Sequence, residues 1–262
     1  MQVTANGLVI REKILSNDNR LLTILTAEYG ILKVFVKSVR KLSGSFAAAT
    51  DLFAYSSFVL FHNKDQYSVN SAETNRIFYH LREDLEKTAL ASYMGELAEE
   101  LAPEGEEAGE YLRFFLNCLH LLEQNKRTTD FIKPLFELRL LTMAGYMPDL
   151  VGCQSCGEYE AEGFYFFPAT GALLCTACSQ GAQPEGAIPL TQAQLAAMRH
   201  IIYSEAGKVF SFKMNQEGLR NLGKITEFYL LTQLDKKFAS LDFYHSLCDI
   251  NLFSQPNDSA NR

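Results

Sequence analysis

Cysteines are the residues of this 262-residue chain whose type and spacing best suit a chemical role. Four of the six form two close pairs, Cys153/Cys156 and Cys175/Cys178, and positions 157–174 separate the pairs. Two residues between ligands let one tight turn present both sulfurs, and a hairpin brings the second turn to the same tetrahedron. We expect this hairpin to have a strand at Phe164–Phe167, a turn at 168–171 and a return at Ala172–Leu174. The spacing therefore predicts one structural Zn²⁺ held by Cys153, Cys156, Cys175 and Cys178.

Two other kinds of cysteine chemistry explain this pattern less well. A catalytic zinc needs an open coordination position and a nearby acid or base, and a nucleobase deaminase places His-x-Glu ahead of its cysteine pair. None of the five histidines is followed two residues later by glutamate. A thioredoxin-type redox pair leaves the second cysteine pair unexplained. We therefore interpret the zinc as a structural ion that stabilises the fold, and we predict no catalytic residue.

Composition places these cysteines in a reducing compartment. Arg20, Glu28 and Lys33 interrupt the apolar stretches, so none reaches the roughly 18 apolar residues of a membrane span. The start of the chain lacks the basic region and apolar core of a signal peptide. We therefore expect a cytoplasmic protein without a membrane partner, in which close thiols are metal ligands and not disulfides.

Charge is distributed unevenly along the chain, although its net value is -7. Positions 1–82 contain ten Lys or Arg and six Asp or Glu, a net charge of +4, so positions 83–262 carry -11. A net negative protein is ordinarily a poor partner for nucleic acid. The basic N-terminal part nevertheless leaves polyanion binding open for that part of the chain.

The N-terminal part of the chain, up to Asn75, shows the short alternating runs and polar turns of a β-meander. We expect strands at positions 7–14, 20–26, 31–39, 52–61 and 66–71. Five short strands within so short a segment predict a small β-barrel of the OB type, and an SH3-like barrel is the alternative.

One predicted strand carries lysines and an aromatic residue on the same face. In positions 31–41, the apolar side chains that alternate with Lys33, Phe35 and Lys37 point into the barrel. An exposed ring between two lysines suits single-stranded nucleic acid, because the ring stacks on a base and the lysines hold phosphates. A solvated strand face with a packed phenylalanine is the alternative, since lysines on exposed strands also serve solubility. The predicted DNA contacts are Lys33, Phe35, Lys37, Arg40, Lys41 and Arg11.

From Thr74 onward, apolar residues recur at spacings of three and four, which predicts helices. The first helix ends at Pro103, and a second is expected at 111–122. A third, capped by Thr129 or Asp130, is expected to run to a glycine cap at Gly145. Thr191 is expected to cap a helix that ends at about Tyr203, and Asn215 to cap the next one. The fold class is thus α+β, with an OB-fold barrel at 1–80 and an all-α domain at 81–262. The four-cysteine, zinc-ribbon-like insert is expected at about 150–180, and the polar residues from Ser254 are expected to be disordered.

Two sequence blocks and the cysteine quartet, in this order, resemble the bacterial recombination mediator RecO family along essentially the whole chain. The first block is Ser16–Gly30 and continues to positions 37–41. The second comprises Phe136–Leu141 and Gly145–Leu150, and leads directly to Cys153. The order and spacing of these features make the resemblance specific.

The resemblance implies an N-terminal OB-fold and a helical domain with a zinc-ribbon-like insert. It implies binding of single- and double-stranded DNA, annealing of complementary strands, and loading of recombinase onto DNA coated with single-stranded-DNA-binding protein (SSB). The implied partners are the C-terminal tail of SSB and the mediator RecR, and no substrate is turned over. The protein would then be associated with the nucleoid, with Lys33, Lys37, Arg40 and Lys41 as DNA contacts. A protein-interaction adaptor that does not bind DNA is the alternative function.

Overall fold

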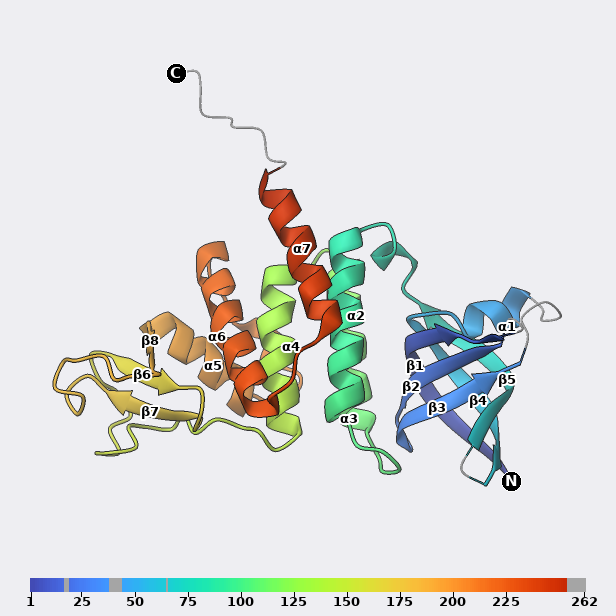
Figure 1. Ribbon diagram of the computed structural model, residues 1–262, viewed down its shortest axis with the longest axis horizontal. Coiled ribbons are helices and arrows are strands. Elements are labelled where there is room, and N and C mark those ends of the chain that lie inside the picture. The colour runs from blue at the N-terminus through green and yellow to red at the C-terminus, as the bar shows by residue number, and fades with distance from the viewer. Residues whose placement is uncertain (17–18, 38–43, 65, 254–262) are drawn as a thin grey trace, which may run out of the picture. The chain divides into compact units, whose positions relative to one another are not determined.

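The computed structural model describes residues 1–16, 19–37, 44–64 and 66–253, the last five of these by their backbone alone (Figure 1). The tail from Ser254, which the sequence predicts to be disordered, lies outside the described residues. The chain forms two compact units, one from Met1 to Thr129 together with Phe238 onward, and the other from Asp130 to Lys237. The domain boundary that the sequence predicts near residue 80 stays a prediction. Every helix among the described residues is too short or too polar to cross a membrane.

The first unit begins with a closed barrel, to which the described residues contribute five strands. These are β1 (Gln2–Ile14), β2 (Arg20–Thr26), β3 (Gly30–Val36), β4 (Ala54–Asn63) and β5 (Gln66–Ile77). Their order is β1-β2-β3-β5-β4, and β4 pairs back with β1. All pairs are antiparallel apart from β3 and β5, which run parallel. This closure of five strands confirms the predicted OB-type barrel.

Alternating side chains fill the barrel, as the period of two requires. The short helix α1 (Gly44–Ala49) separates β3 from β4 in the sequence. Outside β1, the buried interior residues come from β2, β3 and β4, and each strand also has outward-facing positions. The interior cluster is Val9, Leu22, Ile24, Leu32, Val34, Val36, Phe58 and Leu60.

The last strand of the barrel, β5, extends further along the chain than the sequence predicted. The helical period was expected from Thr74, but β5 continues to Ile77, where it pairs with Ala54. The backbone ladder with β4 decides the conformation here, because strand pairing overrides a weak local apolar period. The first strand, β1, also starts earlier than predicted, at Gln2 and not at Gly7.

Besides α1, the described part of this unit contains three longer helices: α2 (Leu85–Leu101), α3 (Gly109–Glu123) and α7 (Ala239–Phe253). The Asp84 side chain caps α2 by accepting a hydrogen bond from the backbone N–H of Lys87. Helix α2 packs against β1 on one side and along α7 on another, as Figure 1 shows. The helices therefore cover part of the outer face of the barrel.

A glycine sets the close approach of α2 to β1. A Cβ atom on Gly95 would lie 2.7 Å from the backbone oxygen of Ile10, which is closer than real Cβ contacts. We expect Gly95→Ala to lower the free energy of unfolding by about 1–3 kcal/mol through overpacking. Urea denaturation followed by circular dichroism measures this loss. Gly109→Ala is the control, because a Cβ there meets open space; equal effects of the two substitutions would contradict the close approach.

The second unit combines helices with a small sheet. Its helices are α4 (Thr129–Met143), α5 (Gln192–Tyr203) and α6 (Gln216–Leu234). Thr191 and Gln194 form a capping box at the start of α5, which confirms the predicted cap. The Asn215 side chain caps α6 by accepting from the N–H of Gly218. The strands of the sheet are β6 (Phe164–Phe167), β7 (Ala172–Cys175) and β8 (Ile188–Leu190), in the order β7-β6-β8.

Candidate metal centre and nucleic-acid interface

Two tight turns and a hairpin bring the four paired cysteines together. The hairpin consists of β6 (Phe164–Phe167) and β7 (Ala172–Cys175), as the sequence predicted, and β8 (Ile188–Leu190) pairs with β6. Cys175 is the last residue of β7, so the hairpin itself carries one ligand to the site. Cys153 lies beside β7 through a bridge to Leu173.

The turn after the first cysteine pair explains the glycine that follows it. The N–H of Gly157 donates to the oxygen of Cys153 at 2.8 Å, and the N–H of Cys153 donates to the oxygen of Glu158 at 2.9 Å. This turn needs a left-handed residue at Gly157, which has φ +76°. A comparable turn follows the second pair, where the N–H of Ser179 donates to the oxygen of Cys175 at 3.1 Å.

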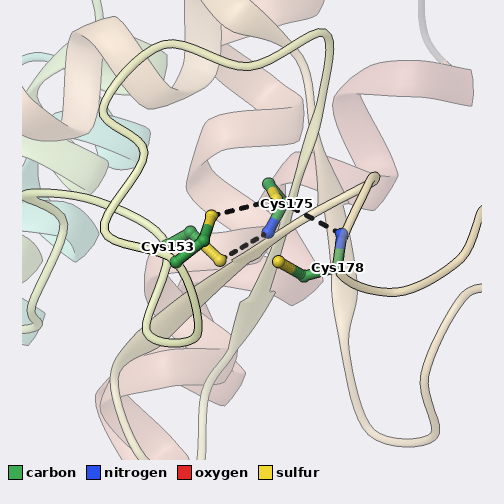
Figure 2. A group of neighbouring side chains, drawn as sticks. Cys153, Cys175 and Cys178 are labelled. Atoms are coloured by element: carbon green, nitrogen blue, oxygen red, sulfur yellow. Dashed lines mark hydrogen bonds between the residues drawn. The ribbon is translucent and has the colours of Figure 1, made fainter.

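The sulfur positions match a tetrahedral metal site. All four Sγ atoms lie within 4.8 Å of one another, and those of Cys156 and Cys175 are 3.8 Å apart. Four sulfurs at about 2.3 Å from a zinc ion would be separated by about 3.8 Å. Figure 2 shows the side chains of Cys153, Cys175 and Cys178 grouped around one position. The quartet is therefore close enough to hold one metal ion.

Backbone donors favour the thiolate form that a metal requires. Cys175 donates its N–H to Sγ of Cys153 at 3.3 Å, and Cys178 donates its N–H to Sγ of Cys175 at 3.4 Å. Burial raises the pKa of Cys153, but hydrogen bonds from the backbone of Cys175, Cys156 and Ser155 outweigh it and lower this pKa to about 6. The thiols of Cys156 and Cys175 raise the pKa of Cys178 to about 12, because they hydrogen-bond with it. A cation at the centre would stabilise the charged forms together.

Arg199 on α5 is a supporting residue that the sequence analysis missed. Its guanidinium donates to the backbone oxygens of Leu150, Val151 and Tyr159, at 2.8, 3.1 and 3.0 Å. It also lies over the Tyr159 ring, 3.9 Å from the ring centre. Through these contacts, Arg199 connects α5 to the segment that forms the first cysteine turn. A lone arginine in an alanine-rich helix was the available signal, but spacing alone does not identify its partners.

The second candidate site is the outer face of β1, β2 and β3. Arg11 pairs with Thr23, and Thr23 pairs with Lys33, so the two cations flank one threonine on the same face. In the next row, Leu21 on β2 lies between Lys13 and Phe35. The strand register thus gathers Arg11, Lys13, Leu21, Lys33 and Phe35 on one surface. Together with the exposed Lys37, which directly follows β3, we call these residues the basic barrel face.

Burial on the basic barrel face follows the predicted alternation. Lys33 and Lys37 are exposed and Phe35 is half-buried. The side chains of Arg11 and Lys33 are 60% and 57% exposed. Arg40 and Lys41 lie outside the described residues.

Glu99 on α2 borders the basic barrel face, and the sequence analysis did not identify it. Its Oε2 lies 3.0 Å from Nη1 of Arg11, and its Oε1 lies 3.5 Å from Nζ of Lys33. The Glu99 side chain is only 19% exposed, whereas both cations keep most of their surface in solvent. One carboxylate therefore compensates two of the predicted DNA contacts.

Comparison with known proteins covers nearly the whole chain. The family described as "Recombination protein O N terminal" matches residues 1–78, and "Recombination protein O C terminal" matches residues 82–242. The protein named "DNA repair protein RecO" of Acetivibrio thermocellus is 32% identical over 242 residues, which are 92% of this chain and 96% of that protein. Proteins of the same name are 28% identical in Alkaliphilus metalliredigens, over 92% of this chain and 98% of that one, and in Symbiobacterium thermophilum, over 92% and 96%.

The order of the two matches agrees with the order of the structural features, a barrel first and then helices with the cysteine site. Together with the 32% identity over 92% of the chain, these matches establish the family. The chain belongs to the RecO family of DNA repair proteins.

Proposed function

We propose that this protein is a recombination mediator that binds single- and double-stranded DNA and anneals complementary strands. It helps to load recombinase onto SSB-coated single strands, and its partners are the C-terminal tail of SSB and RecR. It acts without turning over a substrate, in the cytoplasm at the nucleoid. The observation that carries the DNA-binding part is the basic barrel face, where cations from two strands flank a half-buried phenylalanine.

Annealing follows from electrostatics and stacking on this face. Lysine and arginine side chains neutralise phosphates, which reduces the repulsion between two strands. Phe35 offers its ring to one base, a contact that contributes about 1–3 kcal/mol and leaves base edges free to pair. Docking on the SSB tail would raise the local concentration of the protein where single strands already exist.

The proposed ion in the cysteine site is one structural Zn²⁺. Four thiolates in a tetrahedral arrangement are the typical ligand set of structural zinc, and four protein ligands leave no open position for a substrate. The ion would connect the first cysteine turn to the β6–β7 hairpin. Its role in this proposal is to keep the cysteine turns and the hairpin folded, whereas the barrel binds DNA.

A salt-dependent binding experiment tests the proposed function. Fluorescence anisotropy of a labelled single-stranded oligonucleotide is measured against protein concentration at several salt concentrations. Four phosphate contacts predict a slope of log affinity against log salt near about -3, from about -0.7 per contact. A protein-interaction adaptor, the alternative function, would have little affinity for DNA at any salt concentration.

Removing four predicted contacts should weaken this binding strongly. The variant with alanine at Lys33, Lys37, Arg40 and Lys41 is expected to lose at least about tenfold in affinity at about 0.1 M salt and most of the salt slope. Its annealing rate should fall in parallel. The matched control also removes four positive charges, from exposed lysines of the second unit: Lys208, Lys213, Lys224 and Lys237. A barrel variant that anneals at the wild-type rate would refute the role of this face.

A further inference from the structure

Glu99 is placed between two cations that come from different strands. Arg11 on β1 and Lys33 on β3 each approach a separate oxygen of its carboxylate. Two donors that converge on one pair of acceptor oxygens create a position suited to an oxyanion. In the free protein, the Glu99 carboxylate fills that position.

The packing of α2 holds Glu99 there. Gly95 lies against the backbone of Ile10, and Glu99 follows it by four residues, on the same face of the helix. Ile10 is also the neighbour of Arg11, at the point where the β1–β2 register shifts. The close contact between α2 and β1 therefore places the carboxylate beside Arg11.

The two ion pairs are of the kind that a stronger ligand can displace. Exposed ion pairs contribute little stability, and both cations are more than half exposed. A phosphate group on a polymer has an advantage over Glu99, because neighbouring contacts on the same strand raise its effective concentration. Phe35 lies two residues beyond Lys33 on the same face, about 7 Å along the strand, within reach of a base next to that phosphate.

We propose that Arg11 and Lys33 form a phosphate position for single-stranded DNA, and that Glu99 occupies it in the free protein and is displaced on binding. This inference rests on the proposed DNA-binding function. Glu99 would then set the affinity of the barrel face and limit binding to strands that make enough additional contacts. Removing its charge opens the position without altering either cation.

Glu99→Gln tests the inference by the same anisotropy titration. The variant is expected to bind the oligonucleotide about three- to tenfold more tightly at low salt, since the two ion pairs of Glu99 no longer compete with the phosphate. Its salt slope should stay close to the wild-type value, because Arg11 and Lys33 contact the same phosphate in both complexes once Glu99 has been displaced. Glu107→Gln is the matched control, because it removes the same charge from an exposed loop position of the same unit; it should change affinity by less than about twofold.

A second background separates local competition from a general change in charge. In a protein that already carries Arg11→Ala and Lys33→Ala, Glu99→Gln should have no more effect than Glu107→Gln. An equal gain in both backgrounds would overturn the phosphate position. If the wild-type protein binds DNA and Glu99→Gln binds no more tightly, the phosphate position is wrong and the proposed function stands. If neither protein binds DNA, both the phosphate position and the proposed function are wrong. Thermal unfolding of each variant excludes loss of folded protein as the cause.

Discussion

Replacing Cys175 with serine is expected to abolish stoichiometric zinc binding and to unfold the two cysteine turns and the β6–β7 hairpin. Its Sγ lies 3.8 Å from that of Cys156 and accepts the N–H of Cys178, so this sulfur contacts both turns. Structural zinc contributes on the order of 10 kcal/mol to folding, which exceeds the stability of many small domains. Elemental analysis of protein produced with added zinc, together with circular dichroism on heating, measures both losses.

The control for this prediction is a cysteine outside the quartet. Cys118 on α3 is fully buried, and Cys118→Ala should lower stability modestly while retaining one zinc per chain. The assignment would be wrong if wild-type protein produced with added zinc held clearly less than one zinc per chain. It would also be wrong if the Cys175→Ser protein retained a full equivalent.

Replacing Lys133 with methionine is expected to lower the free energy of unfolding of the second unit by about 3–5 kcal/mol. The buried Lys133 ammonium on α4 lies 2.8 Å from Oε1 of Glu137 and 2.6 Å from Oε2 of Glu227. Glu137 is fully buried, and its other oxygen accepts a hydrogen bond from Thr226 at 2.6 Å. Without the lysine, a buried carboxylate loses its compensating charge, and this is the source of the large effect. Urea denaturation measures the loss.

The stability deficit of Lys133→Met should shrink as the pH falls. Burial raises the pKa of Glu137 even with Lys133 present, and removing the lysine raises it further. Below the raised pKa, the folded protein binds a proton that the unfolded chain still releases, so lowering the pH favours the folded state. The substitution would thus cost less at pH 5 than at pH 8.

Two further variants distinguish charge from size in this network. Lys224→Met changes an exposed lysine on α6 and should alter stability by less than about 0.5 kcal/mol. Lys133→Met combined with Glu137→Leu should recover much of the loss, because apolar replacement of a buried pair is often nearly neutral. A loss below about 1 kcal/mol in Lys133→Met alone would contradict the predicted role of the ion pairs.

Local patterns account for the parts of the fold that the sequence predicted correctly. The Phe164–Phe167 strand, its turn and the return to Cys175 follow from alternation and turn residues within a dozen positions. The caps at Thr191 and Asn215 likewise depend on side chains three residues apart. These features need no knowledge of the rest of the chain.

The candidate sites were predictable only as far as local sequence patterns determine them. Cysteine spacing alone brought four ligands to one position, because the hairpin between the pairs is itself a local structure. The alternation of β3 correctly placed Lys33 and Phe35 on the outer face, and Lys37, directly after the strand, is exposed. Their function as DNA contacts remains a prediction, and neither strand period nor composition reveals which charges lie opposite them.

Sequence alone determined the barrel, the helices capped by local side chains, and the cysteine quartet, since each rests on short-range periodicity, capping or turn chemistry. Only the tertiary structure placed Glu99 on Arg11, 88 residues away in the chain. It likewise decided that β5 continues to Ile77 and that α7 packs along α2. These contacts depend on how completed elements approach one another, as at Gly95, and that approach has no signature in local spacing.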